Sequence, residues 1–467
     1  MLLGIVPQDV EGLPERERAM LAKLISQYDA HAFKNAEKER YYEGNIALKD
    51  VNLGIALPEN IRKLEIGCAW GAKTVDVLAA RSMFEGYVGA SGEDSEELAG
   101  IVEENNLIAE YQKSARDELK FGCTFATLSA TESGRARIRF HSPQAAAAKW
   151  SGEKNRIDYG MAIIDTAPDN NNLIWTPNII NLYTDEAIWV IRKRAEQAWD
   201  AVAYPHQMGR PMMEPMIWNA TTNKPFGRSR IKEPIRRLIQ GYVRTIANAT
   251  IGLEFSTTPQ KYLLGVTDKQ YDQLINQKFK QYVGSIITST ANPQTGENPV
   301  FGQLAQGSIT PHVEMIRVLA TQFSAATGLS VTDTGVVNDA NPTSSDAILA
   351  QTQTLVSIAE QLNTGNAKTL KNIAIMAMAI NNRTTPEGLT EEQRDIIPYF
   401  KNPAMPSVAV TADAAIKIAS SRQSFAMTDT FLEMIGFSQA DIRRIKAQEQ
   451  RQRGLALFNS IEAGAEV

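Results

Sequence analysis

Apolar positions in the first part of the chain recur at helical spacing. From Pro14 to about Tyr42 they lie three and four residues apart, which predicts an amphipathic helix that ends at Glu43-Gly44. Residues 61–83 are apolar enough for a second, buried helix, and an acidic helix is expected around residues 93–120. The chain therefore begins with helices.

A different pattern follows, in which alternation and turn residues predict strands. The strand-like segments are 121–128, 136–140, 161–164 and 173–182. The Pro- and Met-rich passage 204–218 must be largely extended. Together with the preceding helices, these segments predict an α/β region with a mixed sheet over residues 1–233.

Two helices that open with proline flank a polar insert in the middle of the chain. Glu233-Pro234 opens the first, which runs as an apolar stripe until Pro259 closes it. The second has Thr310 as N-cap and Pro311 at its first position, and Gly328 is its C-terminal stop. The insert 260–309 is rich in Gln, Asn, Thr and Gly, with a short helix expected at 268–281 and a hairpin tip at 292–296.

A loop and one very long helix come next. Residues 329–343 hold Gly335, Pro342 and several Asp and Asn residues, so we expect a mobile loop with little to bury. The helical pattern resumes at Ser344 and continues nearly to Asn382. A strand-like segment at 406–411 and two helices separated at Gly436 complete a helix-rich α+β chain.

Composition and charge limit the function. The formal net charge of −5 argues against a generic polyanion binder and against a tight grip on DNA, although it does not exclude contact with DNA. No apolar run approaches the length needed to cross a bilayer, and the short apolar N-terminus lacks the basic leader of a signal peptide. Cys68 and Cys123 are the only cysteines, which favours a reducing compartment.

The candidate catalytic motifs fail on spacing or context. Residues 67–74 resemble a phosphate loop, but Ala72 stands where that loop needs glycine before Lys73, and the spacing between the outer glycines is one residue short. A buried helix is the better interpretation. The four histidines stand alone, and no nucleophile or carboxylate cluster accompanies them. We therefore expect no catalytic residue, no metal and no cofactor. A DNA-packaging nuclease or ATPase subunit is the enzymatic alternative.

Two basic segments allow a nucleic-acid interpretation beside a structural one. Residues 431–453 form a helix–turn–helix pattern with basic residues on the second helix, but such hairpins mostly just pack helices. Arg236, Arg237 and Arg244 of the first middle helix could face DNA. A solvated or intersubunit face is the default for them.

Several segments, in order, resemble portal proteins of long-tailed, siphophage-type phages. The most similar is Pro225–Ile231 with its downstream helix and Pro259–Gly265. The others are Tyr41–Gly44, Leu57–Ile61, Val75–Arg81, Phe84–Tyr87, Gly302–Leu304, Thr327–Leu329, Asn341–Ala347 and Ala412–Lys417. The plan of helix, insert, helix, loop and long helix is also similar.

The resemblance implies a portal fold that assembles into a ring with a central channel. Residues 1–233 would be the N-terminal part of the wing, 234–258 and 310–328 the two stem helices, and 259–309 the clip. Residues 329–343 would be the tunnel loop, 344–411 the long wing helix with the wing closure, and 412–467 the crown.

The implied function is that of the head–tail connector ring, a homododecamer at one capsid vertex of the virion. It would be the channel for packaging and ejection of double-stranded DNA, and a docking platform for the terminase large subunit and the head–tail adaptor protein. The major capsid protein and a scaffold would be further partners, the host cytoplasm would be the place of assembly, and no membrane is implied. Another phage ring, such as an adaptor or baseplate part, is the structural alternative.

The resemblance also points to candidate contact residues. The tunnel-loop candidates for non-specific DNA contact are Val331, Thr332, Asp333, Thr334, Asn338, Asp339 and Asn341. The clip candidates for docking of the motor or the adaptor are Asn292, Gln294, Thr295 and Glu297. Aspartates in the loop would repel phosphates and keep contacts with DNA weak, which suits a polymer that must slide.

Overall fold

The structure is a computed structural model in two compact units, residues 1–400 and residues 401–467. It describes residues 4–47, 65–89, 95–168, 175–194, 198–257, 261–265, 300–303, 308–336, 345–404, 408–437 and 439–465, with single positions at 291, 296 and 298.

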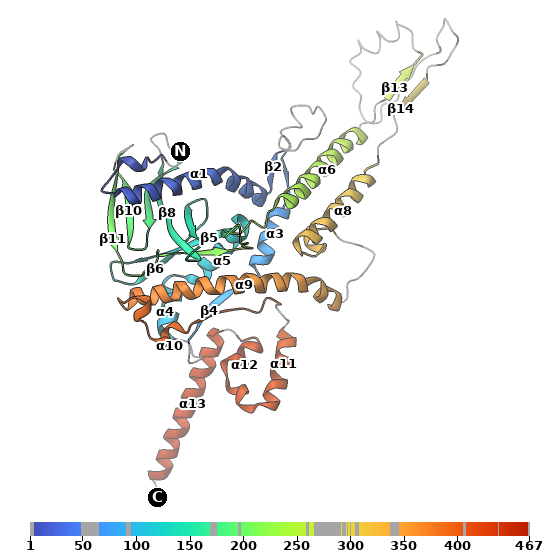
Figure 1. Cartoon of the computed structure of the whole chain (residues 1–467). Helices are drawn as coiled ribbons and strands as arrows, with labels where there is room; N and C mark the ends of the chain where they lie inside the picture. The colour runs from blue at the N-terminus through green and yellow to red at the C-terminus, as the bar shows by residue number, and fades with distance from the viewer. Residues whose placement is uncertain are drawn as a thin grey trace. The chain divides into compact units, whose positions relative to one another are not determined.

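A long helix covers one face of a six-stranded sheet in the first unit (Figure 1). Helix α1 (Glu15–Glu43) ends at Gly44, whose φ of 75° is left-handed. Its Leu21, Leu24 and Ile25 are buried in one cluster with Met161 and Ile180 of the sheet. The strand order is β1 (Val10–Glu11), β11 (Trp199–Pro205), β10 (Ala187–Lys193), β9 (Trp175–Tyr183), β8 (Arg156–Pro168) and β7 (Ala146–Ser151). Only β1 and β11 pair in parallel among these strands, so this sheet is mixed, as predicted.

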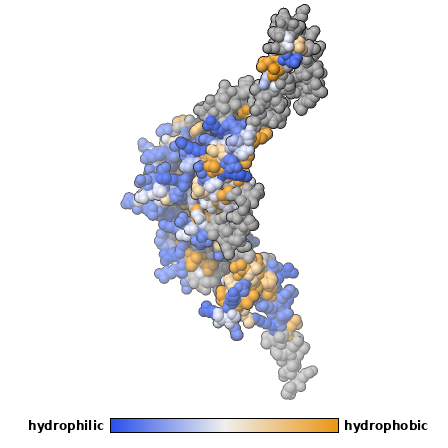
Figure 2. All heavy atoms as spheres, turned by 90° about the vertical axis from the view of Figure 1, so that its right-hand side faces the viewer, coloured by the Kyte–Doolittle hydropathy of each residue, from blue (hydrophilic) through white to orange (hydrophobic). Residues whose placement is uncertain are grey.

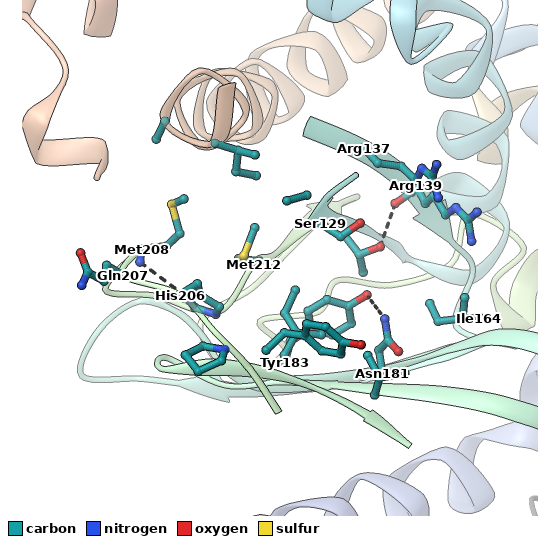
Figure 3. Close-up of a pocket in the computed structure, with 18 of the residues that line it drawn as sticks. Ser129, Arg137, Arg139, Ile164, Asn181, Tyr183, His206, Gln207, Met208 and Met212 are labelled. Carbon is teal, nitrogen blue, oxygen red and sulfur yellow. Dashed lines mark hydrogen bonds between the residues drawn. The ribbon is translucent and has the colours of Figure 1, made fainter. Parts of the chain in front are cut away.

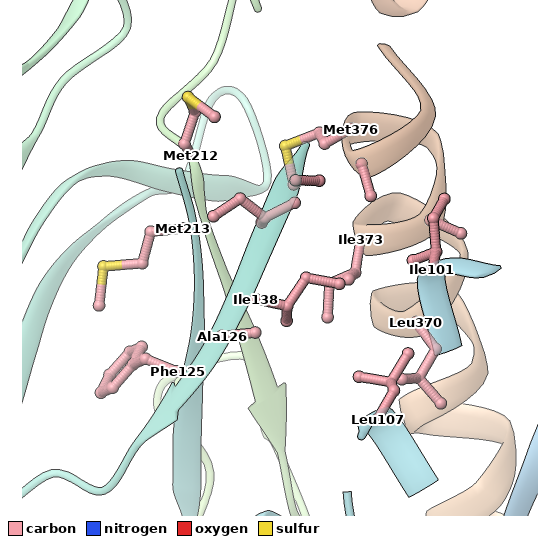
Figure 4. Close-up of a cluster of buried hydrophobic side chains, with 14 of the residues drawn as sticks. Ile101, Leu107, Phe125, Ala126, Ile138, Met212, Met213, Leu370, Ile373 and Met376 are labelled. Atoms are coloured by element: carbon pink, nitrogen blue, oxygen red, sulfur yellow. The ribbon is translucent and has the colours of Figure 1, made fainter. Parts of the chain in front are cut away.

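A second sheet, with three antiparallel strands, packs against helices. Its order is β12 (Met213–Ile217), β5 (Cys123–Ala130) and β6 (Ala136–His141). The covering helices are α4 (Glu96–Glu104), α5 (Leu107–Phe121) and α9 (Ser345–Asn381). Figure 4 shows Ile373 of α9 directed at Ile138 of β6, with Leu107 and Leu370 beside them. A short antiparallel pair, β4 (Phe84–Val88) and β15 (Ile397–Phe400), flanks this core.

A third core joins the predicted pair of middle helices to the rest of the unit. Helices α6 (Glu233–Thr257) and α8 (Thr310–Thr327) lie side by side and antiparallel (Figure 1). Trp70, the first residue of α3 (Trp70–Ala79), lies 4.7 Å from both the Tyr242 and the Phe323 ring centroids. Two further antiparallel pairs are β2 (Asn45–Ala47) with β3 (Glu65–Gly67), and β13 (Lys261–Leu264) with β14 (Val300–Gln303).

The second unit is helical and leaves much apolar surface exposed. It contains α11 (Val408–Ser421), α12 (Asp429–Met434) and α13 (Gln439–Ala465). Figure 2 shows hydrophobic residues gathered over this part of the chain, among them the exposed Val408, Val410 and Ile416. The second unit also has a short helical turn at Gln423–Met427. Short helical turns of the first unit lie at Pro7–Asp9, Thr332–Thr334, Pro386–Gly388 and Glu391–Arg394.

Four of the predicted helices are confirmed within a few residues: α1, α6, α8 and α9. The predicted cap of α8 is wrong by one position, because Ile309 precedes the helix and Thr310 is already helical. The expected helix at 268–281 and the hairpin tip at 292–296 lie outside the described residues.

Three predictions from the pattern are wrong. Residues 65–67 of the expected helix 61–83 are strand β3, because they pair with Asn45–Ala47. The expected helix 93–120 is two helices, since Asn106 between them has a left-handed φ of 48°. The expected strand 406–411 is wrong for its described part, where α11 begins at Val408.

Candidate functional site

The segment that follows α8 is a packed turn. Leu329 is 3% exposed, and Thr332–Thr334 form a single 3-10 turn that Gly335 ends with a φ of 83°. One carboxylate oxygen of Asp333 accepts hydrogen bonds from the Ser330 backbone N–H at 3.0 Å and from the Ser330 hydroxyl at 2.7 Å. Of the described residues 329–336, Leu329 is buried and the 3-10 turn has no buried residue, as expected of a loop with little to bury, although its side chains form hydrogen bonds.

This turn is tied to α3 and to itself. The Trp70 indole N–H donates to the Thr334 carbonyl oxygen at 3.2 Å, and the Thr334 hydroxyl donates to the Val331 carbonyl oxygen at 2.5 Å. The hydroxyl oxygens of Ser330 and Thr332 lie 2.7 Å apart. Thus Val331, Thr332, Asp333 and Thr334 belong to one hydrogen-bonded turn, and only Thr332 among them is classed as exposed. Asn338, Asp339 and Asn341 lie outside the described residues.

A buried arginine that the sequence analysis missed fixes the start of this turn. Arg230 is 7% exposed, and its Nε donates to the Thr74 carbonyl oxygen at 2.6 Å. One of its terminal nitrogens donates to the carbonyl oxygen of Thr327, the last residue of α8, at 2.5 Å. Burial lowers the Arg230 pKa to about 10. The only signal for this role was its place in Pro225–Ile231, the segment most similar to the family.

The three candidate arginines of α6 differ in their surroundings. The Arg236 side chain is 20% exposed and forms ion pairs with Glu37 of α1 and, at 2.7 Å, with Glu233. Arg237 pairs with Glu233 at 3.0 Å while remaining 75% exposed. Arg244 is also exposed. Arg236 therefore links α6 to α1, and the clip candidates Asn292, Gln294, Thr295 and Glu297 lie outside the described residues.

The glycine-rich segment 67–74 is explained by close packing. A Cβ atom on Gly71 would lie 1.9 Å from the Tyr41 carbonyl oxygen, so only glycine lets α3 approach α1 this closely. Lys73, two residues on, is exposed. The predicted buried helix is confirmed for α3, where Trp70, Thr74 and Val75 are buried.

A cavity of about 780 Å³ lies between the six-stranded sheet and the β5–β6 hairpin. Figure 3 shows Tyr183 and Asn181 on one side and Met212, Arg137 and Arg139 on the other. The Asn181 amide donates to the Tyr183 hydroxyl at 3.3 Å. The cavity lining mixes apolar side chains with arginines, His206, Gln207 and short polar side chains, and contains no Asp or Glu.

A half-buried hydroxyl–imidazole pair includes Thr127 of the cavity lining. The Thr127 Oγ1 and His141 Nε2 atoms lie 3.0 Å apart across β5 and β6. Burial, with the nearby Arg139, lowers the His141 pKa to about 4. Because no carboxylate is hydrogen-bonded to this imidazole in the described part of the chain, the pair lacks the third group that orients a general base. We interpret it as a cross-strand contact.

Two other features are absent from the described ranges. No three His, Cys, Asp or Glu side chains lie close enough together there to hold a metal ion. No helix within the same ranges is both long and apolar enough to span a membrane.

Known proteins resemble this chain over most of its length. A curated portal protein of Mycobacterium phage D29 is 21% identical over 463 residues, covering 94% of this chain and 90% of the relative. A chain in the neck of an empty gene transfer agent (GTA) particle is 11% identical with a TM-score of 0.45, covering 81% of this chain and 90% of the other. A chain in the virion of a native GTA particle is 11% identical with a TM-score of 0.42, covering 79% and 90%.

A protein-family model matches most of the chain. The sequence model described as "Phage portal protein, SPP1 Gp6-like" matches residues 21–454, which include most of α1, both middle helices, the turn after α8 and the long α9. The chain belongs to this family of phage portal proteins.

Proposed function

We propose that the chain is the subunit of a homododecameric ring whose central channel conducts double-stranded DNA into and out of the capsid. Family membership supports a portal role. The observation that carries the ring is on α8. One side of this helix, with Leu319, Ala320 and Phe323, is buried in the core shared with α6. Val313, Met315 and Val318 are 43%, 47% and 50% exposed.

Met315 and Val318, three residues apart on one face of α8, form a second, exposed apolar surface. Exposed apolar side chains that lie close together mark interaction surfaces, and a head-to-tail contact between identical chains closes into a ring when its rotation divides the circle. The exposed apolar residues of α11 would add a further contact between copies. We therefore assign the α6–α8 pair to the stem of the ring.

The remaining regions follow from this assignment. Residues 259–309 would be the clip, 329–343 the tunnel loop, and 1–233 with 344–400 the wing. A crown that starts at residue 412 would begin inside α11, whereas the second compact unit begins at Lys401. We propose this unit as the crown. The terminase large subunit and the head–tail adaptor protein would dock on the clip, and the ring would contact the major capsid protein and the scaffold.

We propose a passive, non-enzymatic role in DNA movement. Arg236 is already neutralised by Glu37 and Glu233, so it offers little to DNA phosphates. Weak contacts suit a channel, because each strong phosphate contact releases counterions and opposes sliding. The terminase would supply the energy from nucleotide hydrolysis.

The ring can be tested on α8. Substituting Met315→Glu and Val318→Glu places charges on side chains that are about half exposed in one chain, so the fold should persist. We expect light scattering to give a mass near twelve subunits for the natural chain and near one for this variant. The control is Met315→Leu with Val318→Ile, which keeps the surface apolar and should assemble. Monomers of the natural chain in the presence of capsid protein and scaffold, or rings of the charged variant, would refute the proposal.

A further inference from the structure

A second cavity of the first unit, of about 520 Å³, is lined by basic side chains from two directions. Lys34 and Lys38 reach it from α1, one helical turn apart. Lys224, Arg228 and Lys232 reach it from the segment between β12 and α6. The lining also includes His31 and Arg236, of which Arg236 is ion-paired with Glu37 and Glu233, and it includes no Asp or Glu.

Lys38 is the most enclosed of these five cations. Its ammonium group donates to the Phe121 carbonyl oxygen at 2.9 Å and to the Asn35 side-chain oxygen at 3.3 Å. Both acceptors are neutral, and an ammonium has three N–H groups, so one is left without a partner in the described chain. Burial lowers the Lys38 pKa; Cys123 and Glu37 oppose this shift, and Arg236 and Lys34 add to it. Burying a cation beside other cations costs free energy unless an anion compensates it.

The protein does not supply that anion from the described residues. Lys34, Lys224, Arg228 and Lys232 form no ion pair there, and they are exposed at the rim. The carboxylates of Glu37 and Glu39 on α1 are paired with Arg236 and Lys120. A chain with a net charge of −5 thus concentrates unpaired positive charge at one cavity.

We propose that this cavity is a binding site for phosphate groups, with Lys34 and Lys38 contacting the anion from one side and Lys224, Arg228 and Lys232 from the other. Lysine binds phosphate as a point charge, and the several oxygens of a phosphate can accept hydrogen bonds from ammonium groups on different elements at once. A cavity of this size is within the range of small-ligand sites. The phosphates come either from a free polyphosphate or from a DNA backbone, and the site does not depend on ring formation.

Calorimetric titration of the full-length protein with tripolyphosphate at low salt tests the site. The variant Lys34→Gln with Lys232→Gln removes two rim charges without touching a buried side chain. Since each lost charge-assisted hydrogen bond weakens binding, we expect at least about a tenfold loss of affinity. The control Lys23→Gln with Lys149→Gln removes two exposed lysines outside the lining and should change affinity less than about twofold.

A second titration, with a short DNA duplex, separates the two sources. Duplex binding that the rim variant weakens and the control does not assigns the site to a DNA backbone. Tripolyphosphate binding with the same dependence on the variant, but without duplex binding, assigns it to a free phosphate compound. The proposal is overturned if tripolyphosphate does not bind, or if both variants bind it equally. Binding of a hexaglutamate peptide without binding of tripolyphosphate also overturns it, and would indicate an acidic protein segment.

Discussion

Glu118 of α5 is a carboxyl group placed in the interior without a cation. It is fully buried, and within the described residues its carboxyl group accepts one hydrogen bond, from the Asn366 side-chain N–H of α9 at 2.7 Å. Its other carboxyl oxygen has no partner within the described chain. Burial raises the Glu118 pKa to about 8, against the favourable effect of the Asn366 hydrogen bond. The folded protein therefore keeps this carboxyl mostly protonated at neutral pH.

The pH dependence of stability follows from this shift. Between about pH 4.5 and pH 8 the folded chain retains a proton that the unfolded chain releases. This contribution to the unfolding free energy is full below about pH 4.5 and is lost as the pH rises through 8, by on the order of 4 kcal/mol. Glu118→Gln cannot titrate, so its stability relative to the natural chain should rise across this window. Urea unfolding at both ends measures the difference, and parallel pH profiles would show that Glu118 ionises freely in the fold.

Gly71 and Gly100 form a matched pair of helical glycines. A Cβ atom at Gly71 meets the Tyr41 backbone, whereas one at Gly100 of α4 meets nothing within 4 Å. Gly71→Ala should destabilise the protein by about 1–3 kcal/mol, because α3 and α1 must move apart. Gly100→Ala should stabilise it by about 0.5–1 kcal/mol through helix propensity alone. Thermal unfolding followed by circular dichroism measures both, and equal effects would contradict the close approach of α1 and α3.

At the scale of elements, local signals predicted the long helices. In α6 and α8, prolines at the start and an uninterrupted apolar stripe decide the conformation, so the sequence alone indicates their extent. Pairing between distant segments decides the elements that were missed. Glu65–Gly67 becomes a strand through Asn45–Ala47, and Ala146–Ser151, a strand with three alanines, becomes one through β8. Such pairing leaves no local trace.

The turn after α8 shows the same limit at the candidate site. Asp333 and Thr334 have the composition of a free loop, and the polar pattern gave no sign of their partners. Those partners are Ser330, three residues earlier, and Trp70, far away in the sequence. Composition therefore predicted a loop, whereas the contacts that hold the loop include one to Trp70, far away in the sequence.

Removing the Asp333 carboxylate should loosen this turn. Asp333→Ala loses both bonds from Ser330, a change of about 1 kcal/mol, so hydrogen exchange of the amides in residues 330–335 should speed up about fivefold. Asp333→Asn keeps an oxygen acceptor at the same position and should remain close to the natural rate. If the two variants exchange equally fast, the charge and not the hydrogen bonds holds the turn. If instead Asp333→Asn stays close to the natural rate, it keeps the turn and is the better variant for testing charge effects on DNA passage.

At the scale of the whole molecule, the two units differ in how they bury apolar surface. The clusters of the first unit have many fully buried side chains from distant segments. In the described part of residues 401–467, the buried apolar side chains are Pro403, Ala415 and Ile442. Met427 is 84% exposed, and Val410 is 62% exposed. A unit with so little core gains stability by association, as a ring of identical chains would provide.

Truncation after Phe400 tests this difference. The shortened chain keeps all three clusters whole, because Ala415 and Ile442 belong to none of them. Its melting temperature should therefore stay within about 3 °C of the full chain. Binding of a hydrophobic dye at low protein concentration should fall, because the exposed Val408, Val410, Ile416 and Met427 are removed. The control is a full-length chain with Val410→Ser and Ile416→Ser, which should lower dye binding in part and leave the melting temperature unchanged. A large loss of thermal stability on truncation would mean that the C-terminal helices complete the core of the first unit, and the proposal of a separately packed crown would then fail.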